Sequence, residues 1–353
     1  MSPAADAAWA PQLAARAHLL EGLGPEEALS PEAEAAWRAP FGEPESWDLD
    51  IVDRDLPGPH GRVPVRIYTP RASGGAAEAA DAATDAASDA PGADAGSAPA
   101  RPVLVWIHGG SFQHGDLDMP EAHEVSRGVA GRADAVVVSV FYRLCDEPSG
   151  TPALNPDGET GIHAPIPLDD VHAAFTWVRE HAAELGVDPA RIAVGGASAG
   201  GDLAACLSLR LADEGAPPWQ SFLMYPVAHI EMPAPDAEEA AALAACSPLG
   251  GFPAESVAVM GETYTGRPRD EATGYEFPAL AARHDHLPPT LIDVAEFDGL
   301  RPSGRAYARQ LEAAGVDVEL ALSRGVPHGH LNKVGLAEAH ASMDRMARRL
   351  RER

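Results

Sequence analysis

The sequence predicts an α/β fold with a mostly parallel central sheet that helices cover on both faces. Short apolar runs typical of buried strands alternate with longer segments whose apolar residues recur at helical spacing. Parallel strands buried on both faces produce such near-continuous apolar runs. At 353 residues, the chain is long enough for one large α/β domain or two ordinary ones.

The N-terminal part of the chain divides into two regions. Residues 1–45 alternate Ala-rich helical stretches with Pro and Gly breaks, which predicts two short helices. The main domain, residues 46–353, opens on "SWDLDIVDRDL" and "GRVPVRIYTP", where the apolar period shortens toward two. The turn "PGPHG" joins these runs, so we expect an antiparallel hairpin at the sheet edge.

A low-complexity segment follows the hairpin. Residues 71–101 contain no Leu, Ile, Val, Met or aromatic residue. Such a segment buries too little apolar area to offset the entropy lost on ordering. We expect a disordered surface loop and not a domain linker, because strand signals resume at once with "PVLVWIHGG".

Strands and helices then alternate toward the C-terminus. The expected strands are "AVVVSVFY", "RIAVGG", "WQSFLMYPV", "PPTLIDVAEF" and "VDVELALS". Residues 230–280 interrupt this rhythm and have only helical patterns. Together with residues 1–45, this insertion is expected to form a helical cap over the strand ends, where open α/β sheets bind ligands.

Charge and composition exclude several kinds of partner. Acidic residues outnumber basic ones 53 to 26, which argues against nucleic acid or an anionic membrane as partner. No apolar run could span a bilayer and no leader pattern is present, so we expect a cytoplasmic protein without integral membrane association. Cys145, Cys206 and Cys246 lack metal or disulfide spacing, and we expect no metal and no cofactor. The oligomeric state, a homodimer included, is left open.

The stretch "AVGGASAGGDLAA" places Ser198 where a strand passes into a helix. Gly196 and Gly200 flank the serine at two positions on each side. A turn this sharp strains the corner residue and leaves no room for neighbouring side chains. The pattern is the G-x-S-x-G nucleophile elbow, so Ser198 is the candidate nucleophile.

Oxyanion donors are expected at two places. "VLVWIHGGSFQHG" puts Gly109 and Gly110 directly after a core strand, where glycine lets backbone N–H groups approach a substrate oxygen. The N–H of Ala199, at the start of the elbow helix, is the third candidate.

The candidate orienting acid is Asp298. It ends the strand in "LIDVAEFDGLRPSG", and a residue at a strand end can reach over the sheet. Asp293 and Glu296 lie upstream, within the strand. An Asp before Gly is also common as a simple turn residue.

The candidate base is His328 in "SRGVPHGHLN", with His330 as its competitor. The order Ser198, Asp298, His328 is the order nucleophile, acid, base of an α/β-hydrolase. The loop position and this order favour His328.

The residues resemble the hormone-sensitive lipase-like esterases, a group of α/β-hydrolases. The matching stretches are "HGGSF", "VVVSVFYRL", "GGASAGGDLA", "PPTLIDVAEFDGLR" and "VPHGH", within residues 60–335. The resemblance implies a capped α/β-hydrolase fold and cleavage of carboxylic esters without a cofactor. It also implies family roles for Ser198, Asp298 and His328 as the triad, and for Gly109, Gly110 and Ala199 as oxyanion donors.

Several positions depart from the family pattern. Ala197 stands where an acidic residue commonly precedes the serine, and Phe141 replaces the usual Asp before Tyr-Arg. Ser111 replaces a third glycine, and His330 occupies a usually aromatic place. None of these changes removes a triad member.

The leading hypothesis is a serine carboxylesterase that cleaves short- to medium-chain esters of small molecules through an acyl-enzyme on Ser198. A close alternative is removal of an amide or acetyl group from a specialised metabolite by the same triad. A further alternative is a non-catalytic protein that binds a small molecule on this fold, although such a protein has no need of His328. A cysteine-dependent or metal hydrolase lacks a suitable motif.

Overall fold

Eight strands of the chain form a single sheet in the computed structural model, which describes residues 9–20, 29–71, 100–246 and 251–352. The strands are β1 (Leu49–Gly58), β2 (Gly61–Pro70), β3 (Arg101–Ile107), β4 (Val136–Val140), β5 (Val187–Ala197), β6 (Ser221–Met224), β7 (Thr290–Phe297) and β8 (Val318–Pro327). Their order in the sheet is β1-β2-β4-β3-β5-β6-β7-β8. The β1/β2 and β2/β4 pairs are antiparallel and the others are parallel. The predicted mostly parallel sheet is confirmed, and the expected hairpin lies at its edge.

The helices lie between and after these strands. They are α1 (Pro11–Ala14), α2 (Pro31–Arg38), α3 (Pro120–Ala133), α4 (Ile166–Glu180), α5 (Ala182–Leu185), α6 (Ala199–Asp213), α7 (Ala237–Cys246), α8 (Ala254–Thr265), α9 (Arg301–Ala313) and α10 (Ala337–Arg351). Short 3-10 turns occur at Ala17–Leu20, Arg269–Glu271, Pro278–Leu280 and His330–Asn332.

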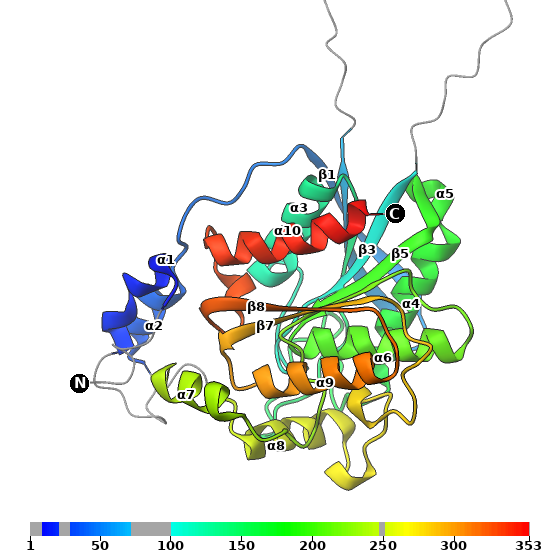
Figure 1. Ribbon diagram of the computed structural model, residues 1–353. Coiled ribbons are helices and arrows are strands. Elements are labelled where there is room, and N and C mark those ends of the chain that lie inside the picture. The colour runs from blue at the N-terminus through cyan, green and yellow to red at the C-terminus, as the bar shows by residue number, and fades with distance from the viewer. Residues whose placement is uncertain (1–8, 21–28, 72–99, 247–250, 353) are drawn as a thin grey trace, which may run out of the picture.

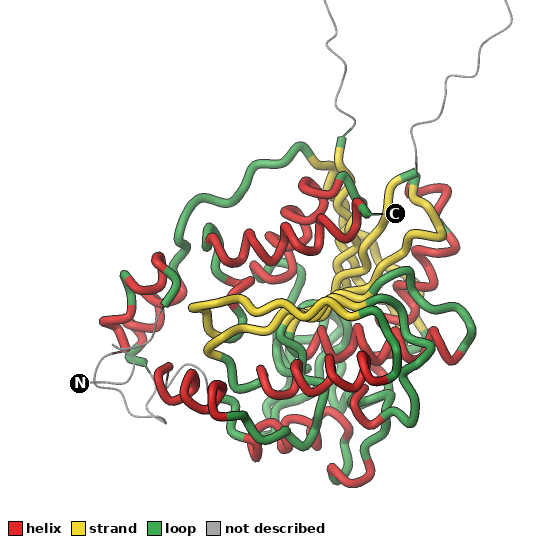
Figure 2. Tube along the Cα trace, in the orientation of Figure 1, coloured by secondary structure: helices red, strands yellow, loops and turns green. Residues whose placement is uncertain are grey.

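Helices cover both faces of the sheet. α3 and α10 lie on one face, and α4, α6 and α9 lie on the other (Figures 1 and 2). Successive side chains of a strand point to opposite faces, so one strand supplies both cores. In β3, Val103 and Val105 pack toward α4 and α6, whereas Leu104 and Trp106 pack toward α3 and α10.

The N-terminal helices are attached to the ends of β7 and β8. Ser30 caps α2, since its hydroxyl accepts the Ala33 N–H at 3.2 Å. The Trp9 ring lies 4.7 Å from the ring of Phe297, the last residue of β7. The Ala10 N–H donates to the Gly325 carbonyl in β8 at 2.9 Å. Trp9 and Ala10, which lead into α1, therefore contact the C-terminal parts of β7 and β8.

Between β6 and β7, the described residues form α7, α8, two 3-10 turns and no strand. Most of the loop expected over residues 71–101 lies outside the described residues; β2 ends at Pro70 and β3 begins at Arg101. None of the described helices has the length and apolar character needed to cross a membrane.

Candidate active site

Ser198 is the single residue between β5 and α6, and its backbone is strained. Its φ is 55° and its ψ is −121°, a region that costs a residue with a side chain about 1–3 kcal/mol. A Cβ on Gly196 would lie 2.1 Å from the Gly200 carbonyl oxygen, and one on Gly200 would lie 2.2 Å from the Ile107 carbonyl oxygen. Both flanking glycines are therefore required by close backbone contact.

The structure brings Ser198, His328 and Asp298 together. His328 follows the end of β8, and its Nε2 lies 2.9 Å from the Ser198 Oγ. The His328 Nδ1 lies 2.7 Å from Oδ2 of Asp298, which follows the end of β7. Asp298 is fully buried, and its Oδ1 accepts the Leu300 N–H at 2.8 Å. The imidazole thus connects a hydroxyl to a fixed carboxylate.

The charge of the surrounding groups favours a protonated His328. Burial alone would lower the pKa of His328, but the Asp298 carboxylate and the more distant Glu121 together raise it above its usual value. The group is therefore a stronger base than a free histidine.

Two of the expected oxyanion donors have unengaged N–H groups. Gly110 has φ 120°, and a Cβ there would lie 2.0 Å from the His114 carbonyl oxygen. Ala199 is the first residue of α6, where N–H groups have no partner within the helix. Among the described residues, the N–H groups of Gly110 and Ala199 donate no hydrogen bond.

The third expected donor is engaged elsewhere. The Gly109 N–H donates to Oε2 of Glu121 at 2.7 Å. A Cβ on Gly109 would lie 2.6 Å from that oxygen and 3.0 Å from the Ser198 Cβ. The Gly109 N–H is therefore engaged by Glu121 in this structure, where it anchors the loop that carries Gly110.

Sequence reasoning missed Glu121, the acceptor for Gly109. It lies in the first turn of α3, where an acidic residue is ordinary helix chemistry, so no signal distinguished it. The side chain is buried, and its Oε1 accepts the Tyr225 hydroxyl at 2.5 Å and Nδ2 of Asn332 at 3.2 Å. Burial raises the pKa of Glu121, although these donors partly oppose that effect.

His330, the competitor for the role of base, lies in another environment. Its Nε2 lies 2.9 Å from the Ser342 Oγ in α10. Burial lowers the pKa of His330 from its usual 6.5 to about 4. Of the other acids considered, Asp293 binds Arg345 at 2.6 Å and Glu296 accepts the Gly325 N–H at 2.7 Å.

A cleft of about 470 Å³ lies between the loop after β3 and α8. Ser111 and Gln113 line one side, and Phe252, Val257 and Met260, from α8 and the residues before it, line the other. The Phe252 ring meets the His328 ring edge to face at 4.6 Å. An apolar group could occupy this cleft, and Phe252 connects the cleft to the imidazole because it contacts both.

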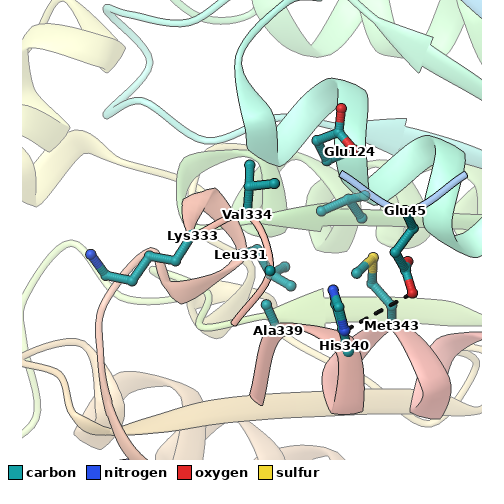
Figure 3. A pocket seen from close by; sticks show the side chains of 10 residues that line it. Glu45, Glu124, Leu331, Lys333, Val334, Ala339, His340 and Met343 are labelled. Atoms are coloured by element: carbon teal, nitrogen blue, oxygen red, sulfur yellow. Dashed lines mark ion pairs between the residues drawn. The ribbon is translucent and has the colours of Figure 1, made fainter. Parts of the chain in front are cut away.

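A second, smaller pocket lies behind the loop that follows His328 (Figure 3). Its volume of about 20 Å³ holds roughly one water molecule. Glu45 and His340 lie 3.9 Å apart at its edge. Lys333 extends away from it, and its Nζ lies 4.7 Å from the centre of the Trp37 ring.

The two cysteines whose side chains are described are unsuited to catalysis. Cys145 and Cys206 are buried and unpaired. Burial raises the pKa of Cys145 to about 12 and raises the pKa of Cys206 well above its usual value, so neither forms the reactive thiolate. In the part of the chain that the structure describes, no group of three or more His, Cys, Asp or Glu side chains is arranged to hold a metal ion.

The chain is similar to known esterases along most of its length. A family model described as an alpha/beta hydrolase fold matches residues 104–332. "Esterase LipI" of Mycobacterium tuberculosis is 33% identical over 295 residues, which cover 83% of this chain and 78% of LipI. "Carboxylesterase NlhH" of the same bacterium is 38% identical over 236 residues, covering 65% and 67%. A hyperthermophilic esterase from the archaeon Pyrobaculum calidifontis has a similar structure, with TM-score 0.67, 29% identity and coverage of 86% and 83%.

Proposed function

Because the chain belongs to the α/β-hydrolase family, we propose that it is a serine carboxylesterase acting on small esters with short to medium acyl chains. Relatives that are 33% and 38% identical carry the names esterase and carboxylesterase. The single observation that supports the mechanism most is the hydrogen-bonded chain from the Ser198 Oγ through His328 to Asp298, at 2.9 and 2.7 Å.

In the proposed acylation step, the Ser198 Oγ attacks the ester carbonyl carbon while its proton passes to Nε2 of His328. The imidazolium then gives this proton to the alcohol oxygen, and the alcohol leaves. Asp298 holds Nδ1–H, so that Nε2 is free to accept the proton. In deacylation, a water molecule attacks the acyl carbon while His328 takes its proton. The imidazolium then returns this proton to the Ser198 Oγ as the acyl–oxygen bond breaks and the acid leaves.

We assign the oxyanion to the N–H groups of Gly110 and Ala199. Ala199 directly follows the nucleophile, and Gly110 lies in the loop after β3. Neither N–H donates a hydrogen bond among the described residues. Donors fixed before the reaction stabilise the developing negative charge without reorganisation, and removal of one typically costs about 10²–10³-fold in kcat. Gly109 has a supporting role through its bond to Glu121.

We further propose that residues 1–45 and 230–280 act as a cap over the site. Two contacts support this. Trp9 lies against Phe297, next to Asp298, and Phe252 lies against His328. Residues 46–229 and 281–353 would then form the catalytic domain.

The test is hydrolysis of nitrophenyl esters from acetate to dodecanoate by wild type, Ser198→Ala and the matched control Ser342→Ala. We expect a chain-length optimum in wild type and in Ser342→Ala, and no enzymatic hydrolysis by Ser198→Ala. Equal activity of Ser198→Ala and wild type would exclude the mechanism. A folded wild type that cleaves no ester would exclude the function itself.

A further inference from the structure

Glu121 collects donors from three separate parts of the chain onto one buried carboxylate. They are the Gly109 N–H after β3, the Tyr225 hydroxyl after β6, and the Asn332 amide in the 3-10 turn after β8. Asn332 also accepts the Glu121 N–H at 3.1 Å. A single side chain therefore links three loops at one edge of the sheet.

Two of these three loops carry a part of the proposed machinery, and the third contacts the base. Gly109 precedes the donor Gly110, and Asn332 lies four residues after His328. Tyr225 reaches both groups, because its hydroxyl binds Glu121 while its ring meets the His328 ring edge to face at 4.8 Å. A shift of Glu121 would move the oxyanion donor and the base together.

The charge of Glu121 has no permanent counterion among the described residues. Two buried carboxylates elsewhere in this fold are compensated by arginine: Asp170 binds Arg143, and Asp293 binds Arg345. No described ion pair includes Glu121, and His328 is the titratable group whose positive charge acts on it. An uncompensated buried carboxylate is costly, so a cation that forms during turnover would relieve that cost.

We propose that Glu121 is a positioning residue that fixes the oxyanion loop to the base loop and supplies a second negative charge to the imidazolium formed on His328. The role rests on the proposed esterase mechanism. Asp298 acts on the same imidazole directly through Nδ1, whereas Glu121 acts across the Tyr225 ring. Phe252 and His330 are the other ring systems near this pair, and His330 is neutral above pH 5.

Two substitutions separate the two parts of this role. Glu121→Gln keeps the length of the side chain and removes its charge. We expect kcat to fall roughly 10- to 100-fold with KM within about twofold, because the effect reaches the transition state through the donors. The acidic limb of the pH profile is expected to move to lower pH, since His328 loses a negative neighbour. Glu121→Asp keeps the negative charge but shortens the side chain. We therefore expect the acidic limb of the pH profile to stay in place while kcat falls.

A matched control and a readout other than activity complete the test. Glu124→Gln alters the next turn of α3, where the carboxylate binds Arg127 at 2.8 Å, and should leave kcat and the pH profile unchanged. Titration of His328 by nuclear magnetic resonance should give a lower pKa in Glu121→Gln than in wild type. An unchanged His328 titration in a folded Glu121→Gln protein would overturn the proposal. If wild type cleaves no ester but the pKa of His328 is still lower in Glu121→Gln than in wild type, the esterase function is overturned and the action of Glu121 on His328 is not.

Discussion

Two clusters of serine, histidine and aspartate lie side by side in this molecule, and they are connected differently. In the first, His328 stands between Ser198 and Asp298. In the second, Ser342 stands in the middle: His330 contacts it at 2.9 Å, and it donates to Asp293 at 2.8 Å. The two histidines are two positions apart in the sequence, with Gly329 between them.

The difference shows that connectivity, and not composition, decides the chemistry. The carboxylate of Asp298 acts on its histidine, which keeps the pKa of His328 raised despite burial. The charge of Asp293 is instead matched by Arg345, and burial lowers the pKa of His330 to about 4. A neutral histidine bonded to a helix serine has no carboxylate to orient it as a base.

The largest contrast is expected between the two serines. Ser198→Ala should lower kcat for ester hydrolysis roughly 10⁴- to 10⁶-fold, because Ser198 is the nucleophilic side chain bonded to His328 among the described residues. Ser342→Ala should leave kcat within about twofold and lower the free energy of unfolding by about 1–2 kcal/mol, through lost buried hydrogen bonds. Steady-state kinetics and denaturant unfolding measure both effects. Comparable losses of kcat in the two variants would break the comparison.

Substitutions of the two aspartates should differ as those of the two serines do: one mainly lowers kcat and the other mainly lowers stability. Asp298→Asn should lower kcat roughly 10⁴-fold, because an amide at Nδ1 stabilises neither the productive tautomer nor the imidazolium. Asp293→Asn should change kcat less than about threefold but destabilise the fold by about 2 kcal/mol, since Arg345 loses its buried partner while a quarter of its side chain stays exposed. Thermal unfolding and kinetics of both variants test this, and a stability loss confined to Asp298→Asn would contradict it.

A smaller effect is expected on acid stability. Folded His330 stays neutral down to about pH 4, whereas the unfolded chain binds a proton below about 6.5. The unfolded state therefore binds more protons in this window, and stability falls as pH falls, by at most about 3 kcal/mol from this residue. In His330→Phe this part of the pH dependence should vanish with kcat preserved, because the ring against Tyr225 is kept.

The base, His328, gives a pH dependence of stability with the opposite sign. The pKa of His328 is raised in the fold, so its contribution to stability is complete below about 6.5 and is lost as pH rises through the folded value. For the reaction itself, kcat/KM should rise with pH as His328 loses its proton, with a midpoint above 6.5. A midpoint below 6.5 would contradict the assigned partners of His328.

Much of the fold follows from local patterns in the sequence. The strand runs and the hairpin could be predicted because each depends on residues close in the chain. The expected strand "WQSFLMYPV" is longer than β6, which ends at Met224, since Tyr225 turns away with φ 38°. That turn aims the Tyr225 hydroxyl at Glu121.

The part of the site that could be predicted is the part whose residues follow strands in a characteristic order along the chain. Ser198, Asp298 and His328 each follow a strand, and parallel strands bring such residues to one edge of the sheet. The hydrogen bond of Gly109 was not predicted because its acceptor, Glu121, is twelve residues away on a helix that folds back. A tertiary contact of this kind leaves no periodic or motif signal, and Asn332 was missed for the same reason.

Lys333 is the single lysine of the 353-residue chain, and its position gives the protein a built-in reporter. Its side chain is 8% exposed and lies over Trp37 of α2, and burial lowers the pKa of Lys333 to about 8. An amine-directed reagent would therefore have one lysine side chain to modify, and α2 protects this side chain from the reagent while it packs over it. The rate of labelling at that nitrogen would measure how often the N-terminal helices lift from the loop that carries His328.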